Sequence, residues 1–463
     1  MNLADLLHAS AERHAQRPAV TDVRSGRSLT YGALARDAGR VTALLTAQGV
    51  QPGQRIGLLA PNAPAYLPAA FGLLSTGACL VPIATNLTPA ERAQVLSEVD
   101  VNGCLSWSES EGFVFSWMNR DAEGPAELRG LEPAFIRFTS GTTDRSKGVV
   151  LSHQATADRV AAADRVLRFT PDDRILWVLP LAYHFAVTIV AYVKAGAHIL
   201  MCPDTRPPAM VDALRRFETS VIYASPFHFE RLGNLPPTGP LKSVRLALST
   251  SAPITQAVMD RFESLYAVPV AQAYGIIEAG LPCINTRVDG APATSVGRPV
   301  PGYEVAIFSD DGARLPAGVA GEIGVRGSGL FSAYYAPWQR REQVTREGWF
   351  LTGDIGRLEK SGALCLEGRK KAVIFVAGLK FFPEEVEACI NRFPGIEESR
   401  VFGEPHPRLG QVPRAEIVLA SGGCDLDALR AHCARELSPY KAPLQFTVVP
   451  AIARTPGGKI LRR

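Results

Sequence analysis

Helical and extended patterns alternate along the first half of this 463-residue chain, and that alternation limits the folds open to it. The apolar spacing switches repeatedly between the period of a helix and the period of a strand. The predicted elements are helices over 1–20, 29–45, 65–75, 154–167 and 209–217, and strands over 55–60, 78–83, 134–138, 149–151, 174–179 and 221–224. Such alternation predicts an α/β fold of doubly wound mixed sheets with helices on both faces.

The chain changes character after Val305. Short strand patterns separated by turn sequences run from Val305 to Val325 and predict a small antiparallel, barrel-like part. The stretch from Val373 to Arg463 predicts a small α+β domain, and the polar run Gly368–Lys371 is the expected boundary. A chain of this length exceeds what one hydrophobic core usually supports. The two expected domains are residues 1–368 and 369–463, joined by a hinge about 369–371.

Composition is that of an ordinary globular protein, with 46% hydrophobic and 20% charged residues. The net charge of +4 is scattered and forms no basic stripe with aromatic residues, which excludes nucleic acid as the expected partner. The longest apolar stretch, Leu176–Met201, is interrupted by Pro180, His184 and Lys194, so buried core elements explain it better than a membrane span. The N-terminus has no signal-peptide pattern and the eight cysteines have no metal-ligand spacing, which favours a reducing cytoplasm.

A loop rich in glycine, serine and threonine lies at Thr139–Gly148, between two apolar runs. Its backbone N–H groups and hydroxyls can wrap phosphate oxygens, and Lys147 adds a positive charge. The order is not that of a Walker A loop, because Lys147 precedes its glycine, and a solvated hairpin fits the composition equally well. A second glycine-framed lysine, Lys459, lies near the C-terminus. Two such lysines in two domains suggest a site that closes over a polyphosphate.

Five blocks in this order resemble the motif series of the adenylate-forming (AMP-binding) superfamily. The blocks are Thr139–Gly148, Tyr274-Gly275-Ile276-Ile277-Glu278, Leu351-Thr352-Gly353-Asp354, Gly368-Arg369 and Gly458-Lys459. The superfamily includes acyl-CoA synthetases, luciferases and the adenylation domains of peptide synthetases. The resemblance covers about residues 29–463. It implies an N-terminal domain that binds AMP and a carboxylate, and a mobile C-terminal domain.

The resemblance also implies roles at the nucleotide. Asp354 matches the aspartate that holds both ribose hydroxyls, since a carboxylate can accept two hydrogen bonds. Tyr274 matches the aromatic residue that stacks on adenine, Gly275 lets the backbone approach the nucleotide, and Glu278 matches the Mg²⁺ ligand. A turn aspartate, a core tyrosine and a helix-cap glutamate are the structural alternatives. The implied nucleotide contacts are Thr139, Ser140, Gly141, Thr142, Thr143, Lys147, Ser251, Ala252, Tyr274, Gly275, Asp354 and Arg369.

Four residues of the C-terminal part match functional positions of the superfamily. Arg369 matches an arginine near the ribose and phosphates, and Lys371 matches the hinge residue, although a solvated charge run is the alternative. Lys459 matches the lysine that bridges carboxylate and α-phosphate oxygens, with a disordered basic tail as the alternative. Gly378 matches the glycine that lines the pantetheine tunnel, or is a simple hairpin glycine. The residues expected to act in catalysis are Lys459, Glu278 and Lys147.

Evidence on the acid substrate is thinner. The block around His184 resembles the one where acyl-CoA synthetases place a gating histidine, although a histidine on an apolar segment can also be a core residue. No aspartate occurs between Arg174 and Met201, which argues against an α-amino acid substrate. The expected pocket lining is His184, Phe185, Phe227, Ala273 and Gly280.

The chain departs from the superfamily pattern at several positions. Ile277 replaces a threonine that contacts the α-phosphate, and the lost hydrogen bond is worth about 1.5–3 kcal/mol. Asp144 replaces a glycine in the phosphate loop and is expected to face solvent. Thr250-Ser251-Ala252 stands where Gly-Gly-Ala is usual. These changes bear on efficiency and not on the expected fold.

The resemblance implies ATP- and Mg²⁺-dependent activation of a carboxylic acid to an acyl-adenylate, followed by thioester formation with coenzyme A. The acceptor is coenzyme A or carrier phosphopantetheine, and it is expected in trans because no carrier domain follows Lys459. Two alternatives stay open: a free-standing adenylation enzyme that loads a separate carrier protein, and a nucleotide-binding pseudoenzyme.

Overall fold

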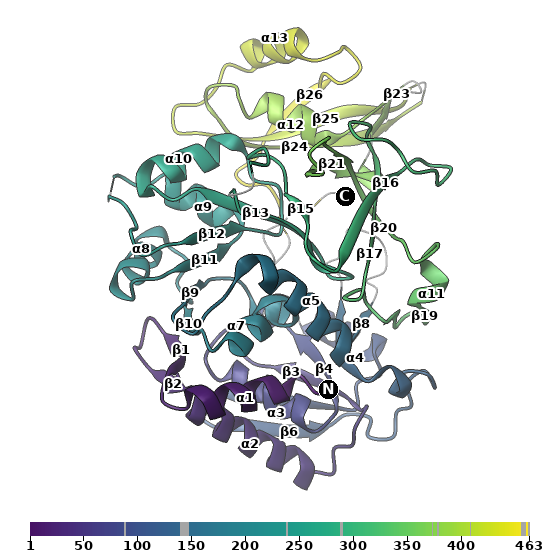
Figure 1. Ribbon diagram of the computed structural model, residues 1–463. Helices are drawn as coiled ribbons and strands as arrows, with labels where there is room; N and C mark the ends of the chain where they lie inside the picture. Colours follow the sequence, from purple (N-terminus) through teal and green to yellow (C-terminus); the bar gives the residue numbers. More distant parts are fainter. Residues whose placement is uncertain are drawn as a thin grey trace. The chain divides into compact units, whose positions relative to one another are not determined.

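The computed structural model of the chain describes residues 1–87, 89–138, 148–237, 239–287, 290–372, 374–376, 379–407, 409–454 and 460–461 (Figure 1). The chain divides into two compact units. The first unit comprises residues 1–305 and 325–350, and the second comprises residues 306–324 and 351–463.

A nine-stranded sheet in the first unit has the order β15-β14-β13-β12-β11-β9-β10-β1-β2. Its strands are β1 (Pro18–Asp22), β2 (Ser28–Thr30), β9 (Arg174–Trp177), β10 (His198–Met201), β11 (Val221–Ala224), β12 (Leu246–Ser249), β13 (Val270–Ile276), β14 (Gly280–Asn285) and β15 (Arg298–Pro299). The six strands from β1 to β13 in that order are parallel, whereas both edges are antiparallel. This mixed pattern confirms the expected sheet class.

An eight-stranded sheet in the same unit has the order β19-β18-β8-β7-β4-β3-β5-β6. Its strands are β3 (Arg55–Leu59), β4 (Cys79–Ile83), β5 (Gly103–Ser108), β6 (Gly112–Trp117), β7 (Pro133–Phe138), β8 (Gly148–Ser152), β18 (Ala333–Tyr334) and β19 (Gln339–Arg340). Strands β7, β4, β3 and β5 are parallel, and β8 pairs antiparallel with β7. One face of β7 packs through Ile136 into a cluster with Val81 and Val150. Phe135 projects from the other face and lies 6.0 Å, ring to ring, from Phe185.

Helices join most of these strands. They are α1 (Ala4–His14), α2 (Tyr31–Ala47), α3 (Tyr66–Ser75), α4 (Pro89–Glu98), α5 (His153–Leu167), α6 (Leu181–His184), a π-helical turn (Phe185–Ile189), α7 (Val190–Ala195), α8 (Pro207–Arg216), α9 (Pro226–Gly233), α10 (Gln256–Tyr266) and α11 (Arg341–Val344). Side-chain hydroxyls cap the N-termini of α2 and α5, because Thr30 accepts a hydrogen bond from Ala33 N and Ser152 accepts one from Ala155 N. The single helix predicted over residues 1–20 was wrong at its end. Pro18 cannot continue a helix, and Val20 pairs with Ile199 of β10.

The segment Leu176–Met201 folds as strand, helix, π-helical turn, helix and strand, as expected for core elements. In the part of the chain that the structure describes, no helix combines the length and apolar character needed to cross a bilayer. All eight cysteines are free.

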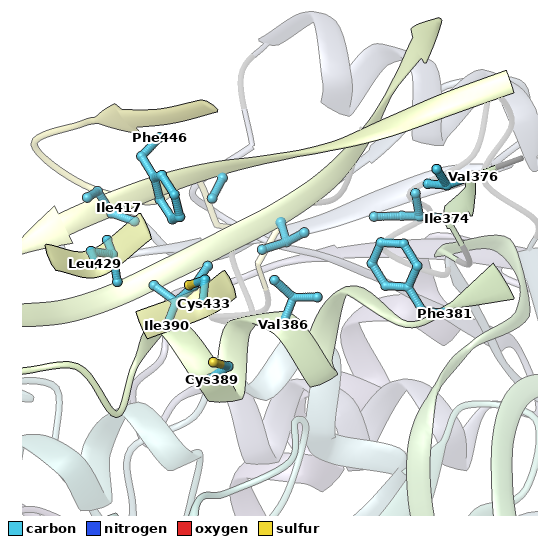
Figure 2. Close-up of a cluster of buried hydrophobic side chains, with 12 residues drawn as sticks. Ile374, Val376, Phe381, Val386, Cys389, Ile390, Ile417, Leu429, Cys433 and Phe446 are labelled. Atoms are coloured by element: carbon cyan, nitrogen blue, oxygen red, sulfur yellow. The ribbon is translucent and has the colours of Figure 1, made fainter. Parts of the chain in front are cut away.

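The second unit is built mainly on a sheet of order β23-β22-β25-β24, with β26 paired to β25. Its elements are β22 (Ile374–Val376), β23 (Leu379–Phe381), α12 (Pro383–Ile390), β24 (Ile396–His406), β25 (Gly410–Leu419), α13 (Leu426–Glu436) and β26 (Gln445–Val448). Apolar side chains of α12 and α13 pack with those of the strands (Figure 2). The cluster includes Val386, Ile390, Ile417, Leu429 and Phe446, all less than 9% exposed. Burial of each such side chain stabilises the folded unit by about 1.5–3 kcal/mol. The predicted α+β character of this part of the chain is confirmed.

A further sheet has the order β16-β17-β20-β21. Its strands are β16 (Tyr303–Phe308), β17 (Gly321–Gly327), β20 (Phe350–Leu358) and β21 (Leu364–Arg369), and the 3₁₀ turn Lys370–Ala372 follows β21. Two of the four strands, β16 and β17, overlap the ends of the stretch that the turn-rich pattern of residues 305–325 predicted.

Candidate functional site

The β13–β14 hairpin carries three of the residues predicted to contact the nucleotide or the metal. Tyr274 is 5% exposed, whereas Gly275 and Glu278 are half-buried at the end of the hairpin. A Cβ atom at Gly275 would lie 2.9 Å from Leu281 Cδ2 and 3.2 Å from Gly280 O. These distances are tighter than ordinary side-chain contacts, so a larger residue here would require Leu281 and the backbone at Gly280 to shift.

Arg159 of α5 fixes the backbone of this hairpin. The Arg159 side chain is 2% exposed and its Nη1 donates to Ile277 O at 2.9 Å, while Nη2 donates to Glu278 O at 3.2 Å. Its Nε and Nη2 also donate to Gly329 O, at 3.0 and 2.6 Å. Gly280 has φ +78°, and a Cβ there would lie 3.0 Å from Arg159 Cδ. Burial lowers the pKa of Arg159, and nearby Tyr303 and Glu278 oppose that effect.

Tyr334 of β18 holds the side chain of Glu278. Its hydroxyl donates to Glu278 Oε1 at 3.1 Å. Burial raises the pKa of Tyr334, and the negative charge of Glu278 raises it further, so the hydroxyl keeps its proton and remains a donor. The ring packs 4.7 Å from that of Phe331, whose backbone N donates to Glu278 O at 2.7 Å. Both the side-chain carboxylate and the backbone carbonyl of Glu278 are therefore held in place.

A single carboxylate is a donor set that fits Mg²⁺, which in nucleotide sites takes one or two carboxylates together with phosphate oxygens and water. Nowhere among the described residues do three or more His, Cys, Asp or Glu side chains form a metal-binding group. Glu278 therefore suits a metal that arrives with ATP better than a resident metal with an all-protein shell.

The predicted pocket residues differ in their surroundings. The His184 ring lies 6.0 Å from Trp177 and 6.5 Å from Tyr223, and these two rings stack at 5.6 Å. Phe185 is 2% exposed and packs against Tyr66 at 5.8 Å. Phe227 of α9 is 38% exposed, and Ala273 of β13 and Gly280 of β14 are buried. The role of each in a pocket stays a prediction.

Ser251 and Ala252 lie in the loop after β12. Ser251 has φ +78°, in the left-handed region where a residue with a Cβ is strained, and Ala252 is exposed. The glycine usual in the superfamily would adopt this conformation without strain.

In the second unit, β20 and β21 bring Asp354 and Arg369 together. The two residues face each other in the strand register, and Arg369 Nε lies 2.9 Å from Asp354 Oδ1. Asp354 is 7% exposed and its backbone N donates to Thr352 Oγ1 at 3.1 Å, while Thr352 Oγ1 donates to Ile323 O at 3.0 Å. The carboxylate is thus held in place by the strands and by a cation.

The turn after β21 contains Lys370 and Lys371. Lys370 Nζ lies 2.9 Å from Glu322 Oε2 and 3.0 Å from Asp310 Oδ1, and both carboxylates raise the pKa of Lys370. The structure places the backbone of Lys371 in the 3₁₀ turn, and its side chain lies outside the description. The hinge assigned to this turn stays a prediction.

Several predicted residues lie outside the described ranges. They are Thr139, Ser140, Gly141, Thr142, Thr143, Lys147, Gly378 and Lys459, together with Asp144 of the same loop. The described residues on either side of Lys459 are anchored. Arg454 forms an antiparallel bridge with Ile460 and an ion pair with Glu398, and Arg400 Nη1 donates to Leu461 O at 2.8 Å.

Comparison with known proteins identifies the family. The AMP-binding enzyme family matches residues 7–335, and the AMP-binding enzyme C-terminal domain matches residues 385–459. The chain therefore belongs to the AMP-binding enzyme family.

Similar proteins extend over nearly the whole chain. A sulfoacetate–CoA ligase of Cupriavidus necator is 29% identical over 492 residues, covering 99% of this chain and 96% of that protein. A feruloyl-CoA synthase of an Amycolatopsis species is 28% identical and covers 98% and 95%. Among solved structures, an ATP-bound RpMatB-BxBclM chimera matches with a TM-score of 0.87 at 25% identity, covering 100% of this chain and 97% of the other. A Mycobacterium tuberculosis fatty acyl CoA synthetase matches with a TM-score of 0.75 at 25% identity, covering 99% and 96%. The resemblance to adenylate-forming enzymes is confirmed, and so is the class, an AMP-forming acid–thiol ligase.

Proposed function

We propose that this protein uses ATP to convert a carboxylic acid into an acyl-adenylate and then transfers the acyl group to the thiol of coenzyme A. The observation that carries the proposal is the match over nearly full length to proteins named as CoA ligases, at both the AMP-binding and the C-terminal domain. The pairing of Asp354 with Arg369 and the support around Glu278 agree with that proposal.

The chemistry divides among the chain's own residues. Asp354 would accept hydrogen bonds from the ribose hydroxyls, and Arg369 would orient its carboxylate. Glu278 would hold Mg²⁺, whose bound charge offsets that of the ATP phosphates. Lys459 would approach the reacting carboxylate and the α-phosphate oxygens. Most of the rate enhancement would come from positioning and from charge neutralisation.

The test is a carboxylate panel assayed for pyrophosphate release and, separately, for thioester formation. Purified protein receives each acid with ATP and Mg²⁺, and then either coenzyme A or a phosphopantetheinylated carrier protein. Glu278→Gln should abolish pyrophosphate release, whereas Glu109→Gln, on the exposed β5–β6 turn, should leave it unchanged. ATP binding without pyrophosphate release from any acid would contradict the proposal and favour a pseudoenzyme.

The acceptor is settled by the second half of the same assay. A thioester with coenzyme A and none with the carrier supports a CoA ligase, and the reverse supports a free-standing adenylation enzyme. Lys459→Ala should abolish adenylation yet preserve thioester formation from a supplied acyl-adenylate. Equal loss of both half-reactions would contradict the role proposed for Lys459.

A further inference from the structure

Arg137 is a charged residue on an otherwise apolar, central strand, β7. It pairs in register with Val149 of β8 and is only 7% exposed. Side chains alternate between the two faces of a strand, so Arg137 shares its face with Phe135, while Ile136 packs on the opposite face. Phe135 lies against Phe185, directly after α6. Arg137 therefore points from near the carboxyl end of β7 toward the side covered by α6.

Among the described residues, none forms a direct ion pair with Arg137. No hydrogen bond joins its guanidinium to another residue in the described ranges either. The Arg137 nitrogens are not among the solvent-inaccessible polar atoms that lack a hydrogen-bond partner, whereas the hydroxyl oxygen of Tyr66 is one of them. Burial lowers the pKa of Arg137 to about 10, so it stays charged at neutral pH. Tyr66, Arg159, Tyr183 and Glu278 are all near enough to affect that pKa.

Of these neighbours, only Glu278 brings a negative charge at neutral pH. Arg159, the other cation, already donates to three backbone carbonyl oxygens and does not neutralise a carboxylate. The group thus holds two buried arginines and one carboxylate. A guanidinium has five N–H donors, and those of Arg137 have no acceptor among the described residues, so they are available to a ligand. The geometry calls for an anionic ligand at Arg137.

We propose that Arg137 binds a second anionic group, a carboxylate or a sulfonate, on a short acid substrate. This inference rests on the proposed function and names the substrate class of the same site. Tyr183 adjoins His184 on α6, the predicted pocket wall, so Arg137 connects that wall with Glu278.

The charge of the ligand distinguishes it from the reacting carboxylate. The reacting group loses its charge when the acyl-adenylate forms, which would leave a buried Arg137 unpaired for the rest of the reaction. A second acidic group stays ionised throughout.

The experiment compares acids of equal size that differ in charge: sulfoacetate with methylsulfonylacetate, and malonate with its monomethyl ester. For the wild-type protein the KM should be lower for the doubly charged member of each pair. Arg137→Met should raise that KM roughly 10- to 100-fold and change the KM of the neutral analogue less than threefold, since a charge-assisted hydrogen bond is lost only in the first case. Arg137→Lys should keep part of the preference for the doubly charged acid. Arg36→Met, on the exposed surface of α2, should leave the KM of both acids unchanged. Equilibrium binding of sulfoacetate by calorimetry, without ATP, should weaken by the same factor.

Three results would overturn the inference. Equal loss with every acid would assign Arg137 to the reacting carboxylate, and a raised KM for ATP with all acids would assign it to the phosphates. A wild-type protein that adenylates the neutral acids without any charge preference would refute the second-anion site while leaving the ligase function intact. Failure to adenylate any acid at all would instead refute the proposed function. If Arg137→Met does not fold, the Arg137→Lys comparison decides the same question.

Discussion

The hydrogen bond from Tyr334 to Glu278 offers a sharp test of how the metal ligand is positioned. Tyr334→Phe removes one hydroxyl oxygen, and the ring keeps its packing 4.7 Å from Phe331 at a position that is 6% exposed. The lost bond, 3.1 Å long, ends on a carboxylate oxygen. A hydrogen bond to a charged group contributes about 1.5–3 kcal/mol. Loss of a partner that orients a metal ligand typically lowers metal affinity about 10- to 100-fold, which is the same range.

The expected result is a 10- to 100-fold rise in the Mg²⁺ concentration that gives half-maximal pyrophosphate release, with little change in the KM of the acid. Binding of Mn²⁺ in the presence of a non-hydrolysable ATP analogue, followed by electron paramagnetic resonance, measures the same effect without turnover. Tyr335→Phe is the matched control. Tyr335 is next in sequence and also buried, but it packs in the cluster on the other face of the sheet, 5.9 Å from the Arg55 guanidinium. An unchanged metal dependence in Tyr334→Phe, or an equal shift in both variants, would refute the positioning role.

Three further predictions test the nucleotide site, the hairpin support and the buried histidines. Asp354→Asn replaces an acceptor oxygen with a donor and should weaken ATP binding at least tenfold in a calorimetric titration, and an unchanged affinity would exclude a ribose contact. Arg159→Met leaves three backbone carbonyls without their donor and should lower the free energy of unfolding by about 3–5 kcal/mol. A loss below about 1 kcal/mol in urea denaturation would contradict the role of Arg159 in fixing the hairpin. Burial lowers the pKa to about 4 at His153, His198 and His228. Since an unfolded histidine has a pKa of about 6.5, the unfolded chain binds more protons between these values, and stability should fall as the pH drops through that window. Each histidine lowers the free energy of unfolding by up to about 1.4 kcal/mol per pH unit within this window. Equal urea midpoints at pH 7 and pH 5 would contradict this loss of stability.

Much of the fold follows from local signals in the sequence. Helices α2 and α5 begin where Thr30 and Ser152 supply capping oxygens, and α13 begins after Asp425, which accepts from Asp427 N at 2.9 Å. Strand order does not follow from such signals. Strand β1 lies between β10 and β2 because Val20 pairs with a residue far away in the sequence, and no local pattern records that pairing. Strands β5 and β6 were not predicted, since serine and glycine weaken their strand pattern.

Only part of the candidate site could likewise be predicted from the sequence. The resemblance to the superfamily's motifs predicted Asp354, Arg369 and Glu278, and the strand register does bring the first two together. Arg159 and Tyr334 were not predicted, although an arginine within the alanine-rich face of residues 154–167 was a usable signal. Their importance arises from contacts between elements that are distant in the sequence. Such contacts depend on the packed structure, so neither composition nor periodicity could specify them.

The π-helical turn at Phe185–Ile189, between α6 and α7, has a consequence for how such an enzyme could diversify. A π turn holds one residue more than an α-helical turn, and these turns occur often at functional sites. Deleting one residue would restore a continuous α-helix and rotate His184 by about 100° relative to α7. Acid selectivity could then be altered through chain length alone, with every nucleotide-binding side chain left unchanged.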